Sequence, residues 1–203
     1  MASLSAIHNI GESIVQLLRN RRGLLAAENR LGPIPAAENI LQINLSTLAG
    51  TPPTAGIAVT CYHVSYSDHT LARAPSADPA ATHGISLELS YLISSWSANA
   101  AVEAAHISWA MLELNRYPTM DRAMLVEPDS WGRDESLQIV PENVAPEQMF
   151  RIWDAVKMKH RLSALFRVRV VRIGYGPVAD APPVVASRMS FAHGDVSEQA
   201  QFA

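Results

Sequence analysis

The stretch that decides the fold is ISLELSYLISSW, residues Ile85–Trp96. Apolar side chains recur at every second position, and Ser86, Glu88 and Ser90 stand between them. Because side chains alternate between the two faces of a strand, this period of two predicts a β-strand with one face buried and one face available. An alanine-rich helical stretch, residues 98–115, follows at once. We therefore expect this strand at the centre of the sheet, with the other elements packed around it.

Further strand patterns occur at Ile40–Leu45, Ile57–Tyr66, Ser136–Val140 and Leu162–Ile173. The last of these, LSALFRVRVVRI, alternates most clearly, and strict alternation places Arg167, Arg169 and Val171 on one face. The second, IAVTCYHVSY, carries similar residues on both faces, which is typical of a strand covered on both sides. Strict alternation there puts His63 on the same face as Val59.

Two more helices complete the pattern. Residues 3–20 show apolar side chains at helical spacing, and we expect Gly23 to end that helix. Pro146 marks the first turn of the other helix, where a proline costs no hydrogen bond. The order of the elements predicts an α+β domain whose mostly antiparallel sheet carries helices on one face. We expect this domain to span residues 1–175 and the Pro/Ala/Ser/Gln-rich residues 176–203 to form an extended C-terminal arm.

Composition limits the classes of function. A hydrophobic fraction of 48% predicts a globular chain, and a net charge of -3 gives no reason to expect nucleic acid as a partner. Cys61 is the only cysteine, so folding needs no intrachain disulfide and suits a reducing cytoplasm. No apolar run approaches the ~20 residues of a membrane helix, while contact with a membrane surface stays an open question.

Catalytic and metal-binding motifs are not evident. His63, Asp68, His69 and His83 match no metal-ligand spacing, so surface or half-buried polar residues are the simpler interpretation. Carboxylates flank Trp131 in two groups, which could bind a cation or act as general acid and base, but which more often form a solvated loop: Glu127, Asp129, Asp134 and Glu135. We therefore predict no catalytic residue, no metal and no cofactor.

Basic residues form the densest charge feature. Arginine supplies fourteen of the sixteen basic residues, a bias that is typical of protein interfaces, although GC-rich coding explains it equally well. Arginines on the exposed face of a strand can pair with carboxylates of a neighbouring subunit and set its register. The alternative is a solvated sheet face. The candidate interface residues are Arg161, Arg167, Arg169 and Arg172.

The ordered combination of several segments resembles one known family. These segments are LELSYLI at 87–93 with Trp96, the helix ending at 114–118, the helix around 149–153, and the strand with FRV at 166–168. The strand with CYHV at 61–64 and the N-terminal helix match in position. Together they resemble the cap, or tail-terminator, proteins of phage-tail-like contractile injection systems, over residues 3–173.

This resemblance implies a structural role. Members of the family form a homohexameric ring that closes the distal end of the inner tube and contractile sheath and ends their polymerisation. The implied partners are other copies of the chain, the inner tube protein and the sheath protein. The four arginines would then contact a subunit or the tube, and the arm would contact the sheath through Val184, Val185, Met189 and Phe191. The protein would assemble in the cytoplasm, in a particle that is either released or anchored.

Two alternatives stay open at this stage. One is a small carboxylate- or histidine-dependent enzyme that uses the groups around Trp131 or His69. The other is a monomeric protein-binding module that docks a partner through the strand with Arg167 and Arg169. The absence of a recognisable motif disfavours the enzyme, while the sequence does not separate a ring from a monomer.

Overall fold

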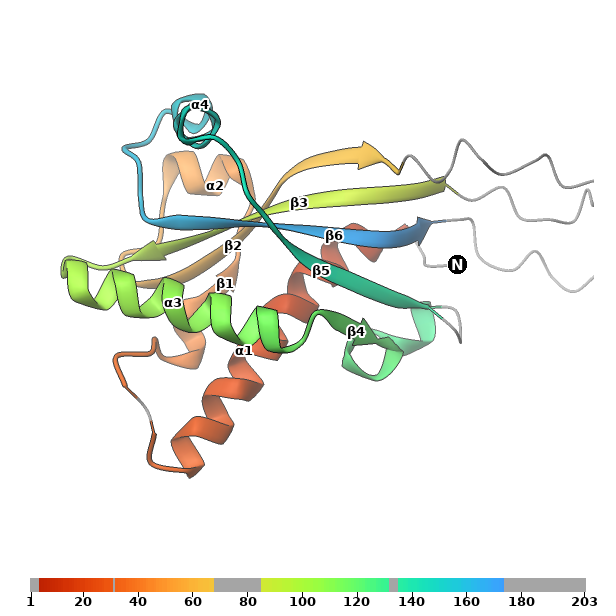
Figure 1. The fold of residues 1–203 in the computed structure, drawn as a ribbon, viewed down its shortest axis with the longest axis horizontal. Coiled ribbons are helices and arrows are strands. Elements are labelled where there is room, and N and C mark those ends of the chain that lie inside the picture. The colour runs from red at the N-terminus through yellow and green to blue at the C-terminus, as the bar shows by residue number, and fades with distance from the viewer. Residues whose placement is uncertain (1–3, 31, 68–84, 132–134, 174–203) are drawn as a thin grey trace, which may run out of the picture.

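A twisted six-stranded sheet forms the centre of the computed structural model, which describes residues 4–30, 32–67, 85–131 and 135–173 (Figure 1). The strand order is β1-β2-β3-β6-β5-β4, and every neighbouring pair is antiparallel except the parallel pair of β1 and β2. The strands are β1 Ile40–Gln42, β2 Gly56–Tyr66, β3 Ile85–Trp96, β4 Thr119–Asp121, β5 Ser136–Glu142 and β6 Ser163–Ile173. The predicted α+β class and the central place of the Ile85–Trp96 strand are confirmed.

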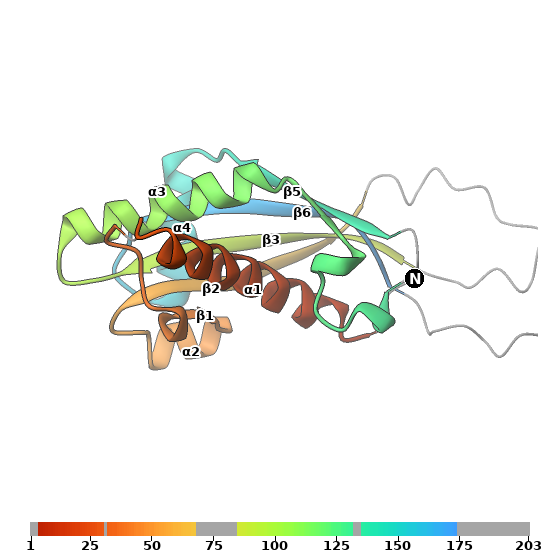
Figure 2. The ribbon, with the colours of Figure 1, turned by 90° about the horizontal axis from the view of Figure 1, so that it is seen from below.

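Helices cover both faces of the sheet, whereas the sequence pattern had predicted helices on one face. Figures 1 and 2 show α1 and α3 on one side and α2 and α4 on the other. The helices are α1 Ala6–Ala27, α2 Leu45–Gly50, α3 Ala100–Arg116 and α4 Pro146–Val156, with short 3-10 turns at Ala37–Asn39, Arg122–Met124 and Pro128–Ser130. The reason lies in β3, where all residues from Leu89 to Trp96 are buried, so that both faces of its second half need a cover.

Two hydrophobic cores result from this arrangement. The larger core packs α1 and α3 against the sheet and includes Ile14, Tyr91 and Phe166. The smaller core packs α2 and α4 against the opposite face, where Trp153 meets Trp96 with ring centroids 6.3 Å apart. The indole nitrogens of both tryptophans donate to serine hydroxyls, so their burial leaves no unsatisfied donor.

A β-bulge in each of two strands changes the predicted faces. In β2 the register with β3 shifts between Cys61 and His63, so that His63 pairs with Ser90. The side chain of His63 therefore lies on the opposite face of the sheet from that of Val59. In β6 the register shifts between the partners of Leu87 and Leu89. The strand gains one residue there, and Val171 returns to the larger core instead of sharing a face with the arginines.

The first helix is longer than predicted and a short helix was missed. Gly23 does not end α1, which continues to Ala27 because Leu25 still packs against the core. After the helix, Asn29 adopts a left-handed conformation with φ 55°. The segment after β1 forms α2 instead of extended chain, since the Asn44 side chain accepts a hydrogen bond from the Thr47 amide and caps it.

Some predictions fall outside the described part of the chain. The proposed C-terminal arm, residues 176–203, and its residues Val184, Val185, Met189 and Phe191 belong to this group, as do Asp68, His69, His83 and Asp134. Within the described residues, none of the helices combines the length and apolarity that crossing a bilayer requires.

Gly56 is the position where the fold depends most directly on glycine. Its φ of +106° suits glycine alone, and an added Cβ would lie 1.9 Å from the backbone oxygen of Asn39. Gly56→Ala should therefore lower the free energy of unfolding by about 2 kcal/mol or more. Gly23→Ala is the matched control, because it lies in a helix with open space around it and should add about 0.5–1 kcal/mol. Urea unfolding of both variants checks this, and an equal effect of the two would contradict it.

His106 on α3 should make stability depend on pH. It is buried, with Nδ1 3.1 Å from the Ser95 hydroxyl, and burial lowers the pKa of this imidazole below its ordinary value. The unfolded chain then takes up the proton at a higher pH than the folded chain, so stability should fall as pH drops through about 6.5. Unfolding in urea between pH 5 and pH 8 should give a flatter profile for His106→Gln, and parallel profiles would contradict this assignment.

Candidate functional site

The open half of one sheet face is the first candidate surface. α2 and α4 cover only one end of their side of the sheet, and no other described helix covers the other end (Figure 1). Polar side chains gather there because the bulge in β2 turns His63 and Ser65 toward this face, which strict alternation would not do. We call this surface the polar sheet face; it consists of Tyr62, His63, Ser65, Glu88, Ser90, Glu142, Arg167 and Arg169.

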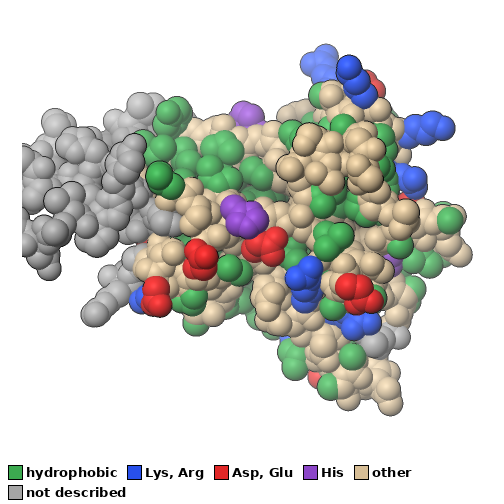
Figure 3. Space-filling model, turned by 180° about the vertical axis from the view of Figure 1, so that it is seen from behind, with side chains coloured by type: hydrophobic (Ala, Val, Ile, Leu, Met, Phe, Trp, Pro, Cys, Tyr) green, Lys and Arg blue, Asp and Glu red, His purple; other side chains and the backbone are tan. Residues whose placement is uncertain are grey.

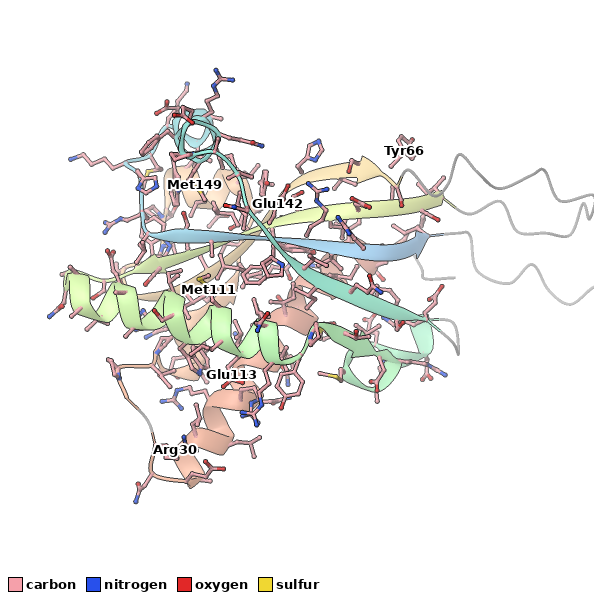
Figure 4. All side chains as sticks on the ribbon, in the orientation of Figure 1. Arg30, Tyr66, Met111, Glu113, Glu142 and Met149 are labelled. Carbon is pink, nitrogen blue, oxygen red and sulfur yellow. The ribbon has the colours of Figure 1, made fainter. Side chains whose placement is uncertain are left out.

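Arg167 is held at the centre of this face by two carboxylates. Its guanidinium pairs with Glu142 on β5 and lies 3.5 Å from Glu88 on β3 (Figure 4 labels Glu142). The hydrogen bond to Glu142 raises the pKa of Arg167 against the opposing effect of burial. Oε2 of Glu142 is buried and has no hydrogen-bond partner among the described residues. Arg167 thus balances charges within the chain.

Arg169 is the freer of the two arginines on β6. Its Nε lies 3.8 Å from Glu88, at the limit of an ion pair, and its side chain is 44% exposed. It shares the face of Arg167, as strict alternation predicted, since both guanidinium groups lie near Glu88. A partner can therefore bind Arg169 without breaking a close ion pair, whereas binding Arg167 would disturb its pairing with Glu142.

The other two candidate arginines lie elsewhere. Arg161 precedes β6 at its opposite end, where it pairs with Glu103 at 3.0 Å and stacks over the Trp96 ring at 5.1 Å. It links the start of α3 to the smaller core. The backbone of Arg172 pairs with Ser86 on β3, and its side chain is outside the described atoms. The four arginines thus do not form one patch.

An apolar groove between α2 and α4 is the second candidate surface, and sequence patterns did not indicate it. It has a volume of about 460 Å³, and Arg151 is the one charged residue among the described residues that line it. The groove adjoins the polar sheet face, because Tyr62 and Gln148 line both hollows. Its lining is Leu45, Ser46, Ala49, Tyr62, Gln148, Arg151, Ile152, Ala155 and Val156. The missed helix α2 explains why the groove was not predicted.

Two of the carboxylates around Trp131, Glu127 and Asp129, have structural partners. Trp131 is buried in the larger core, and its indole nitrogen donates to the Val126 carbonyl at 3.0 Å. Glu127 accepts a hydrogen bond from the Asn9 amide of α1 at 2.8 Å. Asp129 pairs with Arg122 at 2.9 Å. The contact of Glu127 fastens this loop to α1, and that of Asp129 joins it to the turn at Arg122–Met124.

The described histidines and the cysteine are also dispersed. His160 stacks against Phe150 and Trp153, while His106 lies on the buried side of α3. Burial raises the pKa of the Cys61 thiol, which disfavours the reactive thiolate. Within the residues that the structure describes, no three His, Cys, Asp or Glu side chains come together as a metal site would need.

Comparison with known proteins adds the family. Two solved structures have a similar fold: a tube-terminating cap of the anti-feeding prophage, and a sheath/tube terminator of the extracellular contractile injection system PVC in its extended state. The first is 15% identical, with a TM-score of 0.50 over 85% of this chain and 60% of that one. The second is 16% identical, with a TM-score of 0.49 over 75% and 55%. The chain thus spans less than two thirds of either protein.

No curated protein matches the chain. A family match covers most of it, from residue 9 to residue 187, and agrees with the resemblance carried by the central strand and the helices beside it. The chain belongs to the Pvc16 N-terminal domain family.

Proposed function

We propose that this chain is a structural cap that forms a homohexameric ring at the distal end of a contractile injection particle. The ring closes the inner tube and the contractile sheath and ends their polymerisation. The observation that carries the proposal is the family match over residues 9–187. The fold it shares with the anti-feeding prophage tube-terminating cap supports it.

The physics of a terminator is compatible with these surfaces. A six-fold ring needs two different patches on each subunit, which meet head to tail and close by rotation. The apolar groove and the polar sheet face adjoin on one side of the sheet, so together they supply one of these two patches. Such a role needs complementary surfaces and no catalytic group, in keeping with the internal pairing of Glu127 and Asp129.

Contacts within the particle can be assigned more finely. Arg169 contacts the neighbouring subunit or the tube, since its charge is less engaged within the chain. Arg167 and Arg161 pair with carboxylates of the same subunit, Glu142 and Glu103, and so hold their elements in place. The segment with Val184, Val185, Met189 and Phe191 reaches the sheath. The cap assembles with the particle in the cytoplasm.

The oligomeric state and the length of the tube test this proposal. The purified chain, by light scattering, should have about six times its 22.0 kDa mass, either alone or once tube ends are added. Added to polymerising inner tube protein, it should stop growth, and electron microscopy should show one ring at one end of each tube.

A mock addition of buffer is the control, and it should leave tubes long and variable. Tubes of unchanged length with no ring at any end would contradict the cap. A strict monomer that binds a partner without ending polymerisation would instead favour the protein-binding module.

Charge reversal separates the two arginines of β6. Arg167→Glu should leave Glu142 without its cation and Glu88 with the longer contact to Arg169 alone among the described residues. It should lower the free energy of unfolding by about 1–2 kcal/mol, a modest loss because Arg167 is 35% exposed. Arg169→Glu should change stability little and weaken ring formation at tube ends. Thermal unfolding measures the stability of both variants, and electron microscopy of tube ends measures ring formation.

The exposed Arg30 is the matched control for charge reversal, because its one ion pair within the described residues is with Glu28 just after α1. Arg30→Glu should change neither stability nor ring formation. Rings that form equally well with Arg169→Glu would remove Arg169 from the interface and leave the cap itself in place.

A further inference from the structure

The outer edge of β2 is an unusual feature of this sheet. β1 pairs with β2 only from Ile57 to Val59, so the rest of this flank has no strand beside it in the described part of the chain. Figure 1 shows this end of β2 running out beyond β1 at the border of the sheet. A bare edge is a template for pairing with another strand, and natural proteins usually cover or charge such an edge.

The hydrogen-bonding pattern shows which groups point outward. The Ser67 amide donates to the Ser86 carbonyl at 2.9 Å, so Ser67 faces β3. In an antiparallel pair, residues alternate between facing the partner and facing away. Val64 and Tyr66, opposite Leu89 and Leu87, therefore present their amides and carbonyls to the open flank.

Apolar side chains accompany this free edge. Val64 is 43% and Tyr66 is 71% exposed, although their cross-strand neighbours Leu89 and Leu87 belong to the larger core. Figure 3 shows, from behind, hydrophobic side chains grouped over this end of the sheet, and Figure 4 labels Tyr66 at the tip of β2. The opposite face of the same edge carries the polar His63 and Ser65.

A strand that fits this edge must have matching faces. Residues Val184–Phe191 read VVASRMSF. The odd positions of this octapeptide carry three large apolar residues and one serine: Val185, Ser187, Met189 and Phe191. The even positions are smaller or more polar: Val184, Ala186, Arg188 and Ser190. As a strand it would place large apolar side chains beside Val64 and Tyr66, and polar ones beside His63 and Ser65.

The chain can deliver this segment to the edge of its own sheet. β2 and β6 are both antiparallel to β3, so both end at the same side, at Tyr66 and Ile173. Ten residues separate Ile173 from Val184 and span up to ~33 Å. The open flank of β2 lies about three strand spacings, or ~14 Å, from β6. A chain that turns back after β6 meets β2 in the antiparallel direction.

We propose that residues 184–191 dock on the free edge of β2 in the same chain, as an added antiparallel strand next to Tyr62–Tyr66. This docking covers the apolar side chains and the unpaired backbone groups before the particle assembles. The same segment reaches the sheath only after it leaves this edge. The inference goes beyond the cap function and does not depend on the ring.

Hydrogen exchange of the full chain at low micromolar concentration tests the docking. The amides of Val64 and Tyr66 should exchange slowly in the unmodified chain. Met189→Asp with Phe191→Asp puts charge on the apolar side of the docked strand, and it should speed exchange in residues 62–66 by about tenfold or more, since these amides would lose their partners.

Ala186→Asp with Ser190→Asp is the matched control, because it adds the same charge to the opposite side of the same segment. It should leave residues 62–66 protected, and exchange in β5 and β6 should be equal in all three proteins. Fast exchange of Val64 and Tyr66 in the unmodified chain would overturn the proposal. Protection that appears only as concentration rises would also overturn it, because another copy would then supply the strand. Tube capping is measured separately, so either result leaves the cap function to its own test.

Discussion

The burial of β3 on both faces is the constraint on which the rest of this fold depends. From Leu89 to Trp96 the strand has no exposed side, so Tyr91 packs beneath α1 and α3 while Leu92 and Trp96 pack beneath α2 and α4. Burying large side chains such as these contributes about 1.5–3 kcal/mol each, which explains why helices are needed on both faces. The hydroxyl of Tyr91 also donates to the Ile7 carbonyl and fixes the start of α1 over the sheet. The two cores therefore form as one cooperative unit around a single strand.

The two bulges determine which side chains of β2 and β6 lie on the polar sheet face. Each bulge adds one residue to a long strand beside β3, and each therefore reverses the faces of the residues beyond it. In β2 the reversal brings His63 to the face that carries Arg167, and in β6 it returns Val171 to the core. Without the bulge in β2, strict alternation would turn the polar His63 toward the larger core. Without the bulge in β6, it would turn the apolar Val171 away from that core. The register shifts thus allow the same long strands to have buried side chains on both faces at one end of the sheet and polar side chains on one face at the other end.

Sequence patterns predicted the elements better than their faces. The period of two in Ile85–Trp96 and the arginine repeat of β6 gave both long strands, because each strand keeps its alternation over many residues. α2 was missed because six residues are too few for a helical period, and its cap at Asn44 is a local signal. The bulges had no signal at all in the sequence, since an extra residue is defined only by the partner strand. The apolar groove depends on α2, and the pairing of Arg167 with Glu142 joins residues far apart in the chain, so neither was within reach of local patterns.

The surfaces left open by these helices differ in what they offer a partner. The arginines of the polar sheet face already have carboxylates in the chain, so a partner's carboxylate gains only the difference between the two pairings. Exchanges of this kind contribute register and specificity more than affinity. The groove between α2 and α4 has a mostly apolar lining, and filling it removes that surface from water without breaking an ion pair of the described chain. In a ring of the proposed kind, the groove should therefore carry most of the binding free energy, while the adjoining charges decide which orientation of the partner is accepted.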